Sequence, residues 1–178
     1  MVIPANPGLV RDLKEIKLLA LDVDGVMSDG TLYFSANGDE LKGFSILDGL
    51  GIKMLQQGGV IVAIITGRTS PLTARRAENL GIKHIVQGRE DKKVALQELC
   101  KTLNIPLDHC AYMGDDLPDL SAIIASRVGI TVPNGHWFVK EHAQYCTEAN
   151  GGQGAVREVC EIILKAQGKL QKMLDAFL

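Results

Sequence analysis

The segment that most constrains the fold is Val60–Thr66, which has the sequence VIVAIIT. It is rich in β-branched side chains and apolar up to its final residue, so a strand formed here would be buried on both faces. Weaker runs of the same kind occur at Lys17–Val23, Ile82–Val86, Cys110–Met113 and Val128–Val132. Such runs are typical of a parallel sheet that is covered on both sides.

Helix signals separate these runs. Gly49–Gln57 stops at a pair of glycines, and Ser70-Pro71 starts a helix that ends at Gly81. Further helices are predicted at Lys92–Leu103, Leu117–Ala125 and Ala155–Ala166. The alternation predicts an α/β fold, a Rossmann-like doubly wound parallel sheet with right-handed crossovers.

One segment breaks this rhythm. Thr31–Ile46 has two short strand-like pieces around Asn37-Gly38, which is a strong hairpin signal. We therefore expect a β-hairpin flap at about 31–46, between the first strand and the first helix of the alternation.

Composition excludes several functions. A net charge of -2 argues against a nucleic-acid binder, and no apolar run reaches the roughly 20 residues of a membrane span. The four cysteines lack CxxC spacing and are predicted to be reduced, and residues 1–17 lack an apolar signal core. We expect one cytoplasmic domain, 1–178.

Polar residues follow the predicted strands where each one ends. Asp22, Asp24 and Gly25 lie at or after the end of the first run, and Thr66, Gly67 and Arg68 end or follow the second. The GDDLPD segment, with Asp115 and Asp119, follows the fourth, and Lys92 begins a helix. Because parallel strands present their carboxyl ends at one edge, these groups are predicted to meet there.

Three converging carboxylates would repel one another without a cation, and oxygen ligands favour Mg²⁺. Alone, Asp22-Val23-Asp24 could be a strand-end turn, and GDDLPD could be an acidic helix cap. Their joint occurrence with a Thr and a Lys favours phosphoryl transfer. One carboxylate would attack phosphorus, a second would move the proton, and the hydroxyl and ammonium would hold the phosphoryl oxygens.

DVDGVMSDG, ITGR, Lys92 and GDDLPD, in this order, resemble the four motifs of the haloacid dehalogenase-like phosphohydrolases. The resemblance implies Asp22 as nucleophile, Asp24 as acid and base, and Thr66 and Lys92 as phosphate ligands. It also implies Mg²⁺ held by Asp22, the backbone carbonyl of Asp24 and Asp115, with Asp119 in support. The predicted elements fill the segments where a cap domain could be inserted, so a capless member is expected.

The hairpin sequence ANGDELKGF, the helix start DGLGIKML and the tail GGQGAVRE are similar to the 3-deoxy-D-manno-octulosonate 8-phosphate phosphatase family. That resemblance implies hydrolysis of a phosphorylated sugar acid in lipopolysaccharide precursor synthesis, and a homotetramer whose C-terminal tail, here about 150–178, reaches a neighbouring site. It implies substrate contacts by Asp24, Lys92, Gly67 and Arg68, and by Ser45, Ile46, Leu47, Asp48, Gly49, Lys53 and Arg76.

Two positions depart from this pattern, since Leu47 and Gln153 stand where the family commonly has basic residues. Three alternatives therefore stay open. The first is a phosphatase of a related nonulosonate 9-phosphate, and the second is a non-catalytic regulatory or scaffold module of the same fold. The third is a phospho-acceptor signalling domain that resembles a response regulator.

Overall fold

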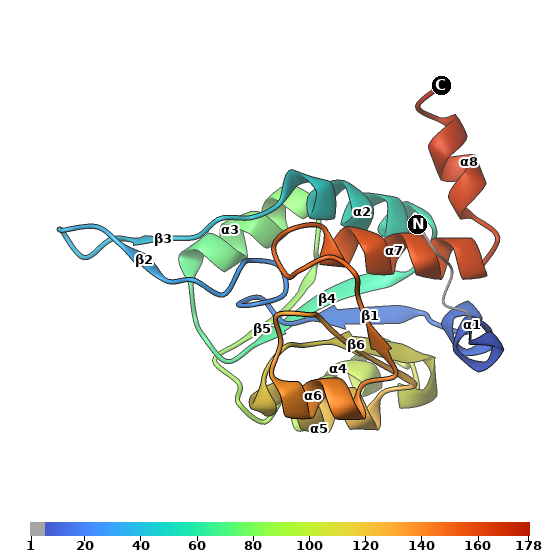
Figure 1. Cartoon of the computed structure of the whole chain (residues 1–178), viewed down its shortest axis with the longest axis horizontal. Coiled ribbons are helices and arrows are strands. Elements are labelled where there is room, and N and C mark those ends of the chain that lie inside the picture. Colours follow the sequence, from blue (N-terminus) through green and yellow to red (C-terminus); the bar gives the residue numbers. More distant parts are fainter. Residues whose placement is uncertain (1–5) are drawn as a thin grey trace.

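A six-stranded parallel sheet runs through the computed structural model, which describes residues 6–178 (Figure 1). The strand order is β5-β4-β1-β6-β7-β8. The strands are β1 (Leu18–Leu21), β4 (Ile61–Thr66), β5 (His84–Gln87), β6 (Cys110–Met113), β7 (Val128–Thr131) and β8 (Tyr145–Cys146). The chain adds strands on one side of β1 and then on the other. The loops after β1, β4 and β6 therefore meet at the switch point, where open α/β sheets bind ligands.

Helices cover both faces of this sheet (Figure 1). On one face lie α2 (Ile46–Gln57), α3 (Pro71–Leu80) and α7 (Ala155–Ala166), with α1 (Pro7–Lys14) packed against α7. On the other face lie α4 (Lys92–Leu103), α5 (Leu120–Ala125) and α6 (Trp137–His142). The layered arrangement confirms the predicted doubly wound α/β fold.

The side chains of β1 show why the strands are apolar throughout. Leu19 and Leu21 point into the core under α2 and α7, whereas Leu18 and Ala20 point into the core under α4 and α5. All four are completely buried. Because neighbouring side chains in a strand alternate, each strand supplies both cores.

Most predicted elements are present, with shifted ends in two helices. The helix expected from Gly49 begins at Ile46, because the Ser45 side chain caps it by accepting a hydrogen bond from the backbone N–H of Asp48. The helix expected at Leu117–Ala125 starts as a 3₁₀ turn, which a capping box between Asp116 and Asp119 closes. The sequence did not predict α1 or the two-residue β8.

The hairpin of β2 (Tyr33–Phe34) and β3 (Glu40–Leu41) is present as expected and projects from the body of the molecule (Figure 1). Within the expected tail segment, about 150–178, the predicted helix is present as α7, which packs against α2 and buries its apolar side chains. Only α8 (Leu170–Asp175) extends from it. Between residues 6 and 178 no helix is long and apolar enough to cross a membrane.

Candidate active site

The loops after β1, β4 and β6 enclose a pocket of about 300 Å³ with the start of α4. The structure brings together the groups that the sequence placed at this edge. The lining includes Asp22, Asp24, Thr66, Gly67, Arg68, Lys92, Asp115 and Asp119. Thr66 is the buried last residue of β4, and Arg68 lies at the partly exposed rim.

Asp22 is a buried carboxylate with one partnered and one free oxygen. Its Oδ2 lies 3.0 Å from the Lys92 ammonium. Its Oδ1 is buried and has no hydrogen-bond partner among residues 6–178. Burial, together with the nearby Asp119 carboxylate, raises the pKa of Asp22 to about 7, although Lys92 opposes the shift. This oxygen is therefore available for a ligand or an electrophile.

Lys92 is held between two carboxylates. Its Nζ donates to Asp119 Oδ1 at 2.7 Å, in addition to its contact with Asp22. Burial lowers the pKa of Lys92, but Asp119 and Asp22 outweigh that effect and raise it. Tyr112, fully buried on β6, donates its hydroxyl to the same Asp119 oxygen at 2.8 Å. These contacts hold a charged ammonium at a fixed place in the pocket.

The carboxylates fit a divalent cation. Asp22, Asp115 and Asp119 each offer an oxygen within 4.8 Å of the others. Burial is the main cause that raises the pKa of Asp115 to about 7, and the neighbouring Asp119 and Asp22 carboxylates add to the shift. Because Asp119 already accepts from Lys92 and Tyr112, Asp22 and Asp115 are the residues suited to hold the ion.

Gly25 lets the backbone approach this cluster. Its φ is +88°, which favours glycine, and a Cβ at this position would overlap the Asp115 carboxylate. The loop after β1 is therefore built to bring main chain against a carboxylate, as a backbone carbonyl ligand next to Gly25 would require.

The hairpin contributes residues that the sequence analysis missed. The buried Lys42 ammonium lies 2.5 Å from Asp24 Oδ1, and Arg68 Nε lies 3.7 Å from the other Asp24 oxygen. Arg68 also pairs with Glu40 at 3.0 Å. Glu40 and Lys42 are two positions apart, so they share one face of the returning strand. That alternation was visible in the sequence, but the contact with Asp24 was not.

Other predicted substrate contacts lie outside this pocket in the single chain. Ile46, Leu47 and Lys53 are exposed on α2. Asp48 is buried and accepts from the backbone N–H of Arg157 at 2.8 Å, so it holds the start of α7. Arg76 donates to the Ser45 carbonyl at 2.8 Å and packs near Gly49. Their predicted contact with substrate stays a prediction.

The two departures from the family pattern lie together. Leu47 and Gln153 line one hollow of about 290 Å³ beside Arg157 and three glutamates. The missing basic residues would thus have faced the same space.

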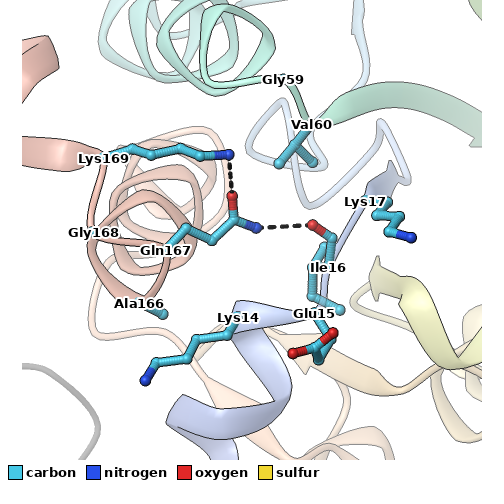
Figure 2. Close-up of a pocket in the computed structure, with 10 residues that line it drawn as sticks. All are labelled: Lys14, Glu15, Ile16, Lys17, Gly59, Val60, Ala166, Gln167, Gly168 and Lys169. Carbon is cyan, nitrogen blue, oxygen red and sulfur yellow. Dashed lines mark hydrogen bonds between the residues drawn. The ribbon is translucent and has the colours of Figure 1, made fainter.

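A larger hollow, of about 590 Å³, lies at the opposite edge of the sheet, before β1 and β4 begin. Figure 2 shows Gln167 donating to the Ile16 carbonyl and accepting from Lys169. Lys14 and Lys17 lie around it, without the cluster of carboxylates found at the other edge. It is therefore not the candidate site.

Comparison with known proteins decides the family. Residues 81–159 match the model of the haloacid dehalogenase-like hydrolases. The chain is 43% identical to the 3-deoxy-D-manno-octulosonate 8-phosphate phosphatase of Salmonella typhimurium, covering 95% of this chain and 90% of the relative. The Yersinia pestis phosphatase of the same name is 45% identical, over 94% of this chain and 90% of the relative. The chain belongs to this phosphatase family.

A solved structure from Moraxella catarrhalis supports the assignment. It has 50% sequence identity and a TM-score of 0.94, covers 96% of this chain, and is itself covered to 98%. That phosphatase is described in complex with a magnesium ion, a phosphate ion and the sugar acid KDO. The family and the geometry of the pocket agree that this chain is a phosphatase.

Proposed function

We propose that this phosphatase hydrolyses 3-deoxy-D-manno-octulosonate 8-phosphate to the free sugar acid and phosphate, with Mg²⁺, in lipopolysaccharide precursor synthesis. The observation that carries the proposal is the Asp22 carboxylate, buried with a free oxygen between Lys92 and Asp115. The high identity to relatives of that name supports the choice of substrate.

The metal would be held by Asp22, Asp115 and the backbone carbonyl of Asp24, with Asp119 in support. Mg²⁺ would offset the charge of the carboxylates and of the incoming phosphate ester.

Asp22 is the proposed nucleophile. Its carboxylate attacks phosphorus, the ester P–O bond breaks, and an aspartyl-phosphate forms on the chain. Lys92 and Thr66 hold the phosphoryl oxygens, where charge spreads in a loose transition state. Lys92 is already fixed by Asp119, so its charge is in place before the substrate arrives.

Asp24 is the proposed acid and base. It protonates the leaving sugar alkoxide and later takes a proton from the water that attacks the aspartyl-phosphate. That second attack releases phosphate and restores Asp22. The contacts of Asp24 with Lys42 and Arg68 keep its carboxyl group facing the pocket.

The open pocket needs further contacts for the sugar end. We propose a cytoplasmic homotetramer in which chains meet through their hairpins and the segment around Ser45–Gly49, Lys53 and Arg76 contacts substrate at or near such a junction. Support comes from exposed apolar side chains on and after the hairpin, among them Phe34, Leu41 and Ile46.

The test is phosphate release with Mg²⁺ from a panel that contains this substrate, a nonulosonate 9-phosphate, and simple hexose and pentose phosphates. We expect kcat/KM for the octulosonate ester to exceed that for the simple sugars by at least about 10²-fold. Equal rates on all esters would refute the assigned substrate, and preference for the nonulosonate would replace it. No turnover on any ester would support a scaffold module.

A further inference from the structure

Two thiols face one another away from the phosphatase pocket. Cys100 lies in the last turn of α4, and Cys110 is the first residue of β6. Their sulfur atoms are 3.3 Å apart, and both residues are buried in the core beneath the sheet. Neither residue takes part in the proposed reaction.

We propose that Cys100 and Cys110 are a modification site, which a peroxide oxidises to a reversible intramolecular disulfide. The two sulfurs need to approach by only about 1.3 Å to reach a covalent S–S distance of about 2.0 Å. The segment between the two cysteines alternates exposed residues with partly buried ones, and it contains a short 3₁₀ turn, Leu107–His109.

The two thiols differ in burial and in pKa. Cys100 is 5% exposed and lines an open surface hollow of about 420 Å³ together with Gln97, Lys101 and Asn104, so it is the cysteine nearer to solvent. Cys110 is completely buried behind it. The hydrogen bond between the sulfurs lowers the pKa of Cys100 and raises that of Cys110. Cys100 is therefore the thiol that meets the oxidant, and Cys110 is the one that resolves the product.

The chemistry balances with a peroxide as the oxidant. The Cys100 thiolate attacks one peroxide oxygen, the O–O bond breaks, and a sulfenic acid forms with release of water or an alcohol. Cys110 then attacks the Cys100 sulfur as the S–O bond breaks, and its proton leaves with the hydroxide as water. Two thiols lose two electrons in total, and the peroxide gains them. A dithiol reductant reverses the bridge.

The bridge would tie the far ends of two elements that carry site residues. Lys92 begins α4, and Asp115 follows β6. Closing this short loop restricts the unfolded chain, so the oxidised protein should unfold at a temperature higher by roughly 5 °C.

The test is controlled oxidation of the full folded chain with stoichiometric hydrogen peroxide, followed by alkylation of the free thiols and tryptic mapping. Lys101 separates the two cysteines, so trypsin places them on different peptides unless a disulfide joins them. We expect a Cys100–Cys110 linked pair, reversal by dithiothreitol, and the higher unfolding temperature.

Two variants sharpen the result. Cys146→Ser removes the exposed thiol and should leave the linked pair unchanged. Cys110→Ser should abolish the temperature rise and leave Cys100 as a sulfenic or sulfinic acid. If Cys110→Ser folds poorly, the tryptic map of the oxidised unmutated chain still tests whether the disulfide forms. The proposal is overturned if Cys100 and Cys110 both stay alkylatable after oxidation, or if oxidation joins only Cys146 residues of different chains.

Discussion

At the scale of single residues, Asp22 lies in an environment that disfavours its negative charge but leaves one carboxylate oxygen free to react. A buried carboxylate with an unpartnered oxygen is unfavourable in itself. Lys92 offsets part of that cost, while Asp119 and Asp115 add to it by repulsion. Such crowding of like charges is common at reactive sites, and a bound cation would offset the repulsion.

Substitution of the proposed nucleophile gives a direct test. Asp22→Asn should lower kcat for phosphate release at least about 10³-fold, since an amide does not form the aspartyl-phosphate. The unfolding temperature of the metal-free variant should equal or exceed that of the unmutated protein, because the substitution removes a repelled buried charge. Asp108→Asn, at an exposed position in the 3₁₀ turn before β6, is the matched control and should keep its activity. Full activity in Asp22→Asn would rule out the mechanism.

The raised pKa values of Asp22 and Asp115 predict how the stabilisation of the folded chain by Mg²⁺ depends on pH. Between the ordinary value of 3.8 and about 7, the metal-free folded state holds more protons than the unfolded state. Its stability therefore falls as the pH rises through this window. Mg²⁺ needs the ionised carboxylates, so it competes with those protons. The rise in unfolding temperature on adding Mg²⁺ should be small at about pH 5.5 and large at about pH 8.5. An equal rise at both values would contradict this cluster as the metal site.

At the scale of elements, the loop after β1 depends on a second loop that packs against it. The backbone N–H of Gly152 donates to the Val26 carbonyl at 2.8 Å, and Gly151 lies directly against Gly25. The glycines before α7 thus support the turn that carries Asp24 and Gly25.

Gly151→Ala tests this support. The added Cβ would overlap the Gly25 carbonyl, and backbone cannot move aside as a flexible side chain could. We expect a loss of stability of about 1–3 kcal/mol and a lower kcat, measured by thermal unfolding and phosphate release. Gly43→Ala is the control for stability, since its Cβ would have no neighbour within 4 Å among the described residues. Equal unfolding temperatures for the two variants would show that the loops are not coupled.

The elements also show what sequence reasoning can reach. Apolar runs and caps are local signals, so β4, α3 and α4 were predicted nearly to the residue. The edge where Asp22, Thr66 and Asp115 meet followed from the rule for parallel strands.

The features that were missed have several physical causes. Lys42 reaches Asp24 because the hairpin returns the chain to a residue 18 positions earlier, and Tyr112 reaches Asp119 across a turn. The first helix of the alternation began earlier than expected because a cap at Ser45 outweighed the glycines that follow. β8 is too short for any periodic signal.

At the scale of the whole molecule, the hairpin exposes apolar side chains that have no partner within one chain among the described residues. Tyr33, Phe34 and Leu41 are 49%, 64% and 60% exposed on an arm that projects from the body (Figure 1). A cluster of exposed apolar side chains is typical of a protein–protein contact. The same segment carries Glu40 and Lys42 to contacts with Arg68 and Asp24 of the pocket, so the proposed assembly would be physically connected to the site.

Phe34→Asp should therefore break the proposed tetramer. Burying a carboxylate at the junction costs more free energy than the aromatic contact contributes. In size-exclusion light scattering the unmutated protein should have about four times the 19.2 kDa mass of the chain, and the variant should have less. Its KM should rise while phosphate chemistry at Asp22 survives, since the separated pocket retains its own carboxylates and Lys92. Trp137→Asp, at an equally exposed apolar side chain on α6, should leave mass and KM unchanged. A single-chain mass for the unmutated, fully active protein would refute assembly as a condition for activity and would leave the hairpin as a flap of its own pocket.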